Sequence, residues 1–379
     1  MMMPASGMTS ASTFCAFFVT PGVGDDGCGH KKGRFCYPRR RRHAEILYIC
    51  TGIILKPMKS RLSVVTWALI AALCSCTGPK DVRVLYWNIQ NGMWADQGNN
   101  YDNFVSFVKE TEPDICIWCE AKSHYRTGSG ESFPNNPDSL YLPSNWDALA
   151  ARYGHKYVFL GGERDFFPQV ITSRYPLEQV LRMTGDSTVT VSHGAGWAVA
   201  HTPAGDINIV TVHTWPQKYG FDIPKNPPEL RKESAARHEG DSARYKEMRW
   251  VVENTIGTDE AAKEHFWILA GDMNSVSRVD NSVYGLPEDS PEFLTQDYLM
   301  GIDCLADAQH ALFDSFVCTA SGNNRRIDYI YCTPPLLERI KKFQVVKDGF
   351  PSNTKTDIRN FWIPSDHYPI VMDISGNAK

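Results

Sequence analysis

Short apolar runs, separated by polar or glycine- and proline-rich stretches, dominate the chain after residue 80. Runs of this length predict buried strands. Apolar side chains at helical spacing predict helices over 103–110 and 234–254 and near 293–300, while the polar stretches 122–147, 214–231 and 275–292 are predicted to be loops. The predicted strands are 82–87, 115–118, 157–160, 169–172, 197–200, 207–212, 267–270 and 328–331.

Two of these runs lie on either side of a turn sequence. Segments 197–200 and 207–212 flank Pro203, Ala204, Gly205 and Asp206, and are predicted to pair as a hairpin. Hairpins require antiparallel pairing, which argues against a doubly wound parallel sheet. We therefore predict an α/β (α+β) fold over residues 82–375, a four-layer sandwich of two packed mixed β-sheets flanked by helices.

A different pattern precedes this domain. Residues 58–61 are basic at Lys59 and Arg61, residues 62–73 are almost wholly apolar, and small residues follow up to Cys76. This pattern predicts a secretory signal peptide over 58–75. Its end resembles a bacterial lipobox, with Cys76 as a lipid-modified first residue. A transmembrane anchor is the competing interpretation, but the run is too short to span a bilayer comfortably.

The signal peptide sets the expected organisation of the whole chain. Residues 76–81 are predicted to be a linker, and residues 1–57 a non-native upstream extension, because a signal peptide does not normally start at residue 58. A targeting or nucleic-acid patch at Arg39–Arg42 is the disfavoured alternative. We expect an exported monomer, held by lipid at a membrane and facing the periplasm or the cell surface.

The charge is distributed unevenly along the chain. Residues 1–75 carry 10 of the 39 lysine and arginine residues but 3 of the 43 acidic ones, so the formal net charge of residues 76–379 is −11. An acidic body lacks the broad positive face that supplies non-specific DNA affinity. The charge does not exclude a nuclease, because bound cations offset local charge.

Cysteines do not point to a disulfide framework. Cys116 and Cys119 have the spacing of a redox or zinc motif, but no second pair is near and both fall in a buried-strand pattern. They are interpreted as buried apolar residues. Cys304 and Cys318 form a candidate bridge in an exported protein.

Polar residues that suit phosphoester chemistry stand where apolar runs end. Each has an ordinary structural interpretation when taken alone: Asp272 and Asn274 suit a turn after a strand, and a lone His213 is more often structural. Their joint occurrence favours a site. The candidates are Asn88, Glu120, His213, Asp272, Asn274, Asp328, Asp366 and His367.

This set resembles the endonuclease/exonuclease/phosphatase superfamily, which includes secreted DNases, abasic-site endonucleases, neutral sphingomyelinases and inositol-polyphosphate phosphatases. The resemblance covers about residues 82–373 and rests on seven short stretches in order. They are 86–88, 114–120, 173–176, 212–213, 271–274, 326–329 and 365–367.

The resemblance and the residue chemistry together imply a role for each candidate. Asn88 and Glu120, with Asp366, are expected to bind Mg²⁺, with Mn²⁺ or Ca²⁺ as alternatives, because carboxylate and amide oxygens select hard cations. The cation would polarise the phosphoryl group. No covalent intermediate is implied, so water attacks in line.

The remaining candidates are expected to handle the water and the developing charge. His367 is the expected general base, oriented by Asp328 or Asp366. Asp272 would position or deprotonate the water. Asn274 and His213 would donate hydrogen bonds to the non-bridging oxygens.

The substrate is a phosphate ester whose class the sequence leaves open. An exported phosphodiesterase or phosphomonoesterase acting on a small or lipid-linked phosphate is favoured over an extracellular DNA or RNA endonuclease, and over a catalytically silent binding module. Trp215 and Tyr219 could stack on a base or sugar, but packing within the loop is preferred. The basic residues that follow, including Arg244 and Arg249, are interpreted as a solvated helix face balanced by acidic residues such as Glu247.

Overall fold

The computed structural model of the protein describes residues 80–122, 146–165, 167–313, 315–321, 324–348 and 365–377. The predicted extension 1–57, the signal peptide 58–75, the lipid site Cys76 and nearly all of the loop 122–147 lie outside these residues. No helix within the described ranges combines the length and apolar character needed to cross a bilayer.

Two mixed six-stranded sheets form the centre of the domain. The first has the order β11 (Ile340–Val345), β12 (Ile370–Ile374), β1 (Val82–Asn88), β2 (Ile115–Cys119), β4 (Val170–Ser173), β3 (Tyr157–Leu160). The second has the order β5 (Leu177–Gly185), β6 (Thr190–Thr202), β7 (Gly205–His213), β8 (Phe266–Asp272), β10 (Asp328–Cys332), β9 (Ala306–Asp307). One pair in each sheet, β1–β2 and β7–β8, is parallel.

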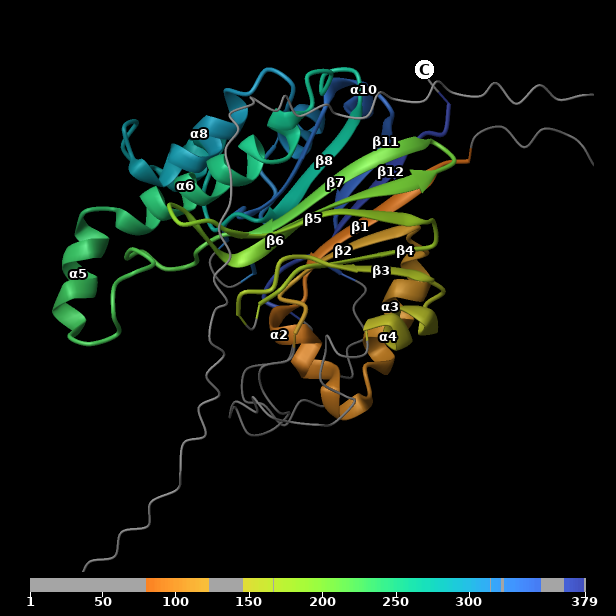
Figure 1. Cartoon of the computed structure of the whole chain (residues 1–379), viewed down its shortest axis with the longest axis horizontal. Helices are drawn as coiled ribbons and strands as arrows, with labels where there is room; N and C mark the ends of the chain where they lie inside the picture. The colour runs from red at the N-terminus through yellow and green to blue at the C-terminus, as the bar shows by residue number, and fades with distance from the viewer. Residues whose placement is uncertain are drawn as a thin grey trace, which may run out of the picture. The chain divides into compact units, whose positions relative to one another are not determined.

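Helices cover the outer face of each sheet, so the predicted four-layer sandwich is confirmed (Figure 1). Helices α3 (Asp102–Thr111) and α4 (Trp146–Arg152) pack on the first sheet, and α6 (Glu239–Glu253) and α8 (Leu294–Met300) on the second. The other helical elements are α2 (Gln90–Met93), α5 (Pro228–Ala236), α7 (Asn281–Tyr284), α9 (Ala308–Leu312), α10 (Pro334–Leu337), and the 3₁₀ turns η1 (Trp94–Asn99), η2 (Ile256–Thr258), η3 (Arg278–Asp280) and η4 (Pro291–Phe293).

Strand β1 shows why the sequence folds into layers. Alternate side chains of a strand point to opposite faces, and here Val84 and Tyr86 enter the core between the sheets. Leu85 and Trp87 point outward and pack under α3. Both faces of β1 are therefore buried, which explains its continuous apolar run.

The structure differs from the predicted elements in several places. The helix predicted over 234–254 is two helices, because the backbone is left-handed at His238, with φ +54°. Helix α5 begins at Pro228, inside the predicted loop 214–231. Strands β9, β11 and β12 were not predicted, and neither was β5, an edge strand whose side chains are mostly exposed, with only Met183 buried.

The described cysteines are all free thiols, so the candidate bridge between Cys304 and Cys318 is absent. Cys116 and Cys119 are buried in β2, as the apolar interpretation predicts.

Candidate active site

The candidate residues meet at one end of the sandwich because of how the strands run. Strands β1 and β2 are parallel and end at Asn88 and next to Glu120. Strands β7 and β8 are parallel and end at His213 and Asp272, which pair in register. Strand β10 is antiparallel to β8, so its first residue, Asp328, pairs with Asp272.

An imidazole–carboxylate pair lies at the centre of this end. His367 Nδ1 is 2.7 Å from Asp328 Oδ2, and Tyr86 donates its hydroxyl to Asp328 Oδ1 at 2.7 Å. Burial alone would lower the pKa of His367, but the Asp328 and Asp272 carboxylates raise it well above its usual value. Of the two residues predicted to orient His367, Asp328 is the one that contacts its Nδ1 atom.

Asp272 is the hub of the cluster. Its Oδ2 accepts a hydrogen bond from Asn88 Nδ2 at 3.0 Å, and its Oδ1 accepts one from the backbone N–H of Asn274 at 3.0 Å. The same Oδ2 lies 3.6 Å from His213 Nε2 and 3.7 Å from His367 Nε2. Burial, reinforced by the Asp328 charge, raises the pKa of Asp272 to about 7.

Glu120 lies opposite Asp272 across Asn88. Its carboxylate accepts hydrogen bonds from the Asn91 N–H at 2.9 Å and from Asn88 Nδ2 at 3.3 Å. The residue has a left-handed backbone, with φ +53°, which turns the chain sharply at the end of β2. Burial, and secondarily the charge of Asp366, raise the pKa of Glu120.

These residues fit a divalent cation. Glu120, His213 and Asp272 each offer a ligand atom within 4.8 Å of one another, and so do Asp272, Asp328 and His367. Carboxylate oxygens dominate both groups, which suits Mg²⁺, Mn²⁺ or Ca²⁺. Crowded acids whose pKa values are raised by burial are the arrangement that a bound positive charge would relieve.

Asp366 and Asn274 are placed less centrally than the other candidates. The Asp366 side chain is 52% exposed and its Oδ1 lies 3.9 Å from His367 Nε2, so it stands at the rim. Asn274 has φ +44° and uses one Nδ2 hydrogen on the Thr214 carbonyl at 3.1 Å. The roles assigned to both residues stay predictions.

Sequence reasoning missed three residues of the site. Tyr86 donates a hydrogen bond to Asp328, and Ser365 Oγ accepts the His367 N–H at 3.1 Å and donates to the Asn88 carbonyl at 2.7 Å. The His193 ring packs against the His213 ring at a tilt. Tyr86 had a usable signal, because it stands two positions before Asn88 and shares its face of β1. Nothing in the sequence around His193 marks it as a site residue.

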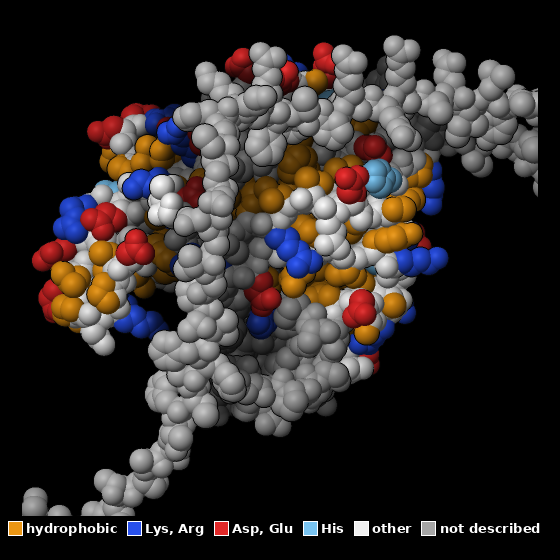
Figure 2. All heavy atoms as spheres, viewed as in Figure 1, with side chains coloured by type: hydrophobic (Ala, Val, Ile, Leu, Met, Phe, Trp, Pro, Cys, Tyr) orange, Lys and Arg blue, Asp and Glu red, His pale blue; other side chains and the backbone are white. Residues whose placement is uncertain are grey.

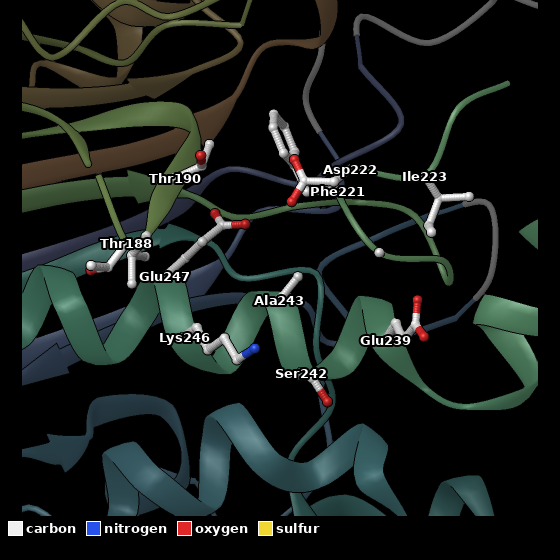
Figure 3. A pocket seen from close by; sticks show the side chains of 12 residues that line it. Thr188, Thr190, Phe221, Asp222, Ile223, Glu239, Ser242, Ala243, Lys246 and Glu247 are labelled. Carbon is white, nitrogen blue, oxygen red and sulfur yellow. The ribbon is translucent and has the colours of Figure 1, made fainter. Parts of the chain in front are cut away.

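The loop after His213 packs on itself, as preferred from the sequence. Trp215 Nε1 donates to the Tyr219 carbonyl at 2.6 Å, and its ring meets Tyr219 and Phe221 edge-on. A cavity of about 290 Å³ lies behind Phe221, between residues 188–190, 220–223 and α6 (Figure 3). None of the candidate catalytic residues lines it.

Part of the interpretation of the following helix as a solvated face was wrong. Arg249 is exposed and pairs with Glu253, but Arg244 is buried and donates to the carbonyls of Trp215 and Gln217 at 2.9 and 3.0 Å. Glu247 is buried as well. The loop after His213 lies against this face of α6 and removes it from solvent.

Comparison with known proteins points to one family. The profile of the Endonuclease/Exonuclease/phosphatase family matches residues 85–367. An AP endonuclease from Archaeoglobus fulgidus is similar in structure, at 17% identity and a TM-score of 0.50 over 77% of this chain and 98% of that chain. The human Nocturnin catalytic domain, with bound sulfate anion, matches at 14% identity and 0.50 over 78% and 93%. At these identities the likeness shows the fold. No curated protein matches the sequence.

Proposed function

This chain belongs to the endonuclease/exonuclease/phosphatase family, and we propose that it is a divalent-metal-dependent phosphoesterase that hydrolyses a phosphodiester or a phosphomonoester. One observation carries the proposal. Asp272 Oδ2 lies within 3.7 Å of the Nε2 atoms of both His213 and His367, while His367 Nδ1 is held by Asp328. The site thus joins a candidate cation site to a proton-transfer pair.

The side chains divide the reaction between them. Glu120 and Asn88, with Asp366 at the rim, would hold a cation that supplies Lewis-acid stabilisation of the phosphoryl charge. Asp272 and His367 form the pair that positions the attacking water and takes its proton. Asp328 fixes the His367 tautomer and balances its charge. As the new phosphorus–oxygen bond forms, the water proton passes to the Asp272–His367 pair, the ester bond opposite breaks, and the leaving oxygen takes a proton from solvent.

Two further groups would stabilise charge on the non-bridging oxygens. His213 pairs with Asp272 in register and Asn274 follows it two residues later, and each would donate a hydrogen bond toward the phosphoryl group. Burial and the neighbouring His193 and His367 hold the pKa of His213 well below its usual value. His213 would therefore act as a neutral donor and add no further positive charge.

The charge of the protein supports a small or lipid-linked phosphate ester over nucleic acid. Residues 76–379 have a formal net charge of −11. Figure 2 shows basic and acidic side chains intermixed over α5 and α6 on the face in view, with no broad positive surface among the described residues seen there. Extended DNA contact depends on such a surface.

The test is hydrolysis of bis-p-nitrophenyl phosphate, p-nitrophenyl phosphate and plasmid DNA, each with Mg²⁺ and with EDTA. The expected result is EDTA-sensitive cleavage of the small esters that is lost in Asp272→Ala. Asp206→Ala, at the far end of β7, is the matched control. EDTA-sensitive DNA cleavage would make the protein a nuclease, and activity retained in Asp272→Ala would overturn the site.

The proposal includes export and a lipid anchor, supported by the basic and apolar pattern of residues 58–76. A membrane-fractionation assay of wild type and Cys76→Ser tests it. The variant should leave the membrane fraction while keeping its activity on soluble esters. Equal membrane association of both proteins would argue against lipid attachment.

A further inference from the structure

Among the described residues, no hydrogen bond fixes Nδ1 of the His213 ring. Its Nε2 faces Asp272 at 3.6 Å, and among the described residues its buried Nδ1 has no hydrogen-bond partner. A catalytic imidazole is ordinarily fixed by the group that its second nitrogen binds. The orientation of His213 must therefore come from the packing of its ring.

The ring of His193 packs against the ring of His213. The two rings lie 4.3 Å apart, centroid to centroid, at an interplanar angle of 34°. Phe167 meets both rings edge-on, at 5.1 Å from His193 and 6.4 Å from His213. His193 is part of strand β6 and His213 ends the neighbouring strand β7, so the contact between the two rings joins two adjacent strands.

Asp165 in turn fixes His193. The carboxylate Oδ2 lies 2.6 Å from His193 Nδ1, and the His193 side chain is only 4% exposed. A charge-assisted hydrogen bond of this length holds a ring in one rotation. The His193 Nε2 is buried and has no hydrogen-bond partner within the described part of the chain, so the link to Asp165 is the polar contact that sets the ring.

The segment that carries Asp165 is docked rigidly on β6. Gly162 donates its N–H to the Ala195 carbonyl at 2.6 Å. Gly194 has φ +80°, and a Cβ there would lie 1.6 Å from the Gly162 carbonyl oxygen. Only glycine permits this approach, and it places Asp165 beside His193.

We propose that Asp165 and His193 form a positioning pair for His213. The pair acts through the contact between the His193 and His213 rings and not by contact with the substrate. The inference rests on the proposed function in so far as His213 donates to the phosphoryl group. It goes further by naming what holds that donor in place. His201 and Asp206, joined by a 2.9 Å contact at the far end of β6 and β7, are a matched pair with no route to the site.

The experiment is a mutant cycle of Asp165→Ala, His193→Phe and the double variant, with kcat and KM measured on bis-p-nitrophenyl phosphate. Each single variant should lower kcat about tenfold with little change in KM, because a misplaced donor affects the transition state more than binding. The double variant should lose no more than either single one. His201→Phe and Asp206→Ala should retain wild-type kcat.

A second measurement does not depend on turnover. Nitrogen-15 spectra of the His213 imidazole, assigned by its loss in His213→Gln, should change in Asp165→Ala and stay unchanged in Asp206→Ala. His193→Phe keeps an aromatic ring at this position, and thermal unfolding of each variant shows whether the fold persists. If the wild type hydrolyses no ester, the proposed function fails while these spectra still decide the positioning pair.

Any of four results would overturn the positioning pair, and the first three concern Asp165→Ala and the double variant. They are a wild-type kcat in Asp165→Ala, losses that multiply in the double variant, and an unchanged His213 spectrum in Asp165→Ala. A raised KM with unchanged kcat in His193→Phe would also contradict it, since that pattern marks direct substrate binding.

Discussion

His367 Nδ1 lies 2.7 Å from Asp328 Oδ2, across the gap between the two sheets. Asp328 opens β10 of the second sheet, and His367 precedes β12 of the first. The backbone ties each partner in place, since Asp328 N–H donates to Thr319 Oγ1 and the His367 carbonyl accepts from Trp87 Nε1. The pair therefore exists only when both sheets are packed together.

Asp328→Asn should lower kcat by about 10²- to 10⁴-fold. The carboxamide oxygen can keep the hydrogen bond from Tyr86 only by turning its NH₂ group toward His367 Nδ1. That contact imposes the other tautomer and removes the charge that supports an imidazolium. The measurement is kcat on bis-p-nitrophenyl phosphate, with thermal unfolding to show that the fold persists. Asp259→Asn, whose carboxylate pairs with exposed His265, is the control, and a loss below about threefold in Asp328→Asn would contradict the assignment.

Tyr86→Phe should separate support of Asp328 from packing. Removing the hydroxyl leaves Asp328 Oδ1 without its 2.7 Å donor, so the free energy of unfolding should fall by about 1–2 kcal/mol and kcat by about three- to tenfold. Tyr331→Phe removes a similar buried hydrogen bond, 2.8 Å to Gln296 Oε1. It should cost comparable stability in urea unfolding but leave kcat unchanged. Equal kcat in the two variants would show that the Tyr86 hydroxyl does not support Asp328 in catalysis.

The positions of the catalytic candidates could be predicted because strand ends are visible in the sequence. Asn88, Glu120, His213 and Asp272 each follow an apolar run, and the periodicity that predicts a buried strand also locates its end. Eight of the strands were predictable for the same reason, but the buried strand β12 was not predicted. Strand β5 was not, since an exposed edge strand lacks apolar alternation.

The supporting residues could not be predicted, because they depend on contacts between distant segments. Asp165 contacts His193, 28 positions later in the chain. Arg244 is buried against a loop whose carbonyls, 27 and 29 positions before it, accept its hydrogen bonds. Neither residue differs locally from a solvated one. The left-handed backbone at His238 could not be predicted either. It lies next to Gly240, whose N–H donates to the Lys218 carbonyl of a distant loop.

Mg²⁺ should raise the thermal stability of the wild type and not that of Glu120→Gln. Glu120 and Asp272 are crowded acids whose pKa values are raised by burial, so a cation that binds only the folded protein stabilises it. At a concentration 100 times Kd the gain is about 2.7 kcal/mol, or several degrees in Tm. The measurement is Tm against MgCl₂ at constant ionic strength. Asp259→Asn should respond like the wild type, and an equal response in Glu120→Gln would remove Glu120 from the cation site.

Glu247 should make the stability of the fold depend on pH. Its Oε2 accepts hydrogen bonds from Ser192 N–H at 3.2 Å and Ser192 Oγ at 2.9 Å, which joins α6 to β6. Burial raises the pKa of this carboxyl to about 7, against an ordinary value of 4.5. The folded protein thus binds the Glu247 proton more tightly than the unfolded chain does. The stabilisation is complete below pH 4.5 and is lost as the pH rises through 7, amounting to about 3 kcal/mol as an upper value.

Glu247→Gln should remove this dependence, because the amide does not ionise. Its free energy of unfolding in urea is measured with EDTA between pH 5 and 8 beside that of the wild type, and the difference, wild type minus variant, is the deficit of the variant. The deficit should shrink toward pH 8, because ionising the buried Glu247 carboxyl lowers the free energy of unfolding of the wild type. Groups in the catalytic cluster titrate alike in both proteins and cancel in the difference. A deficit that is constant across the range would show that Glu247 titrates as an ordinary carboxyl.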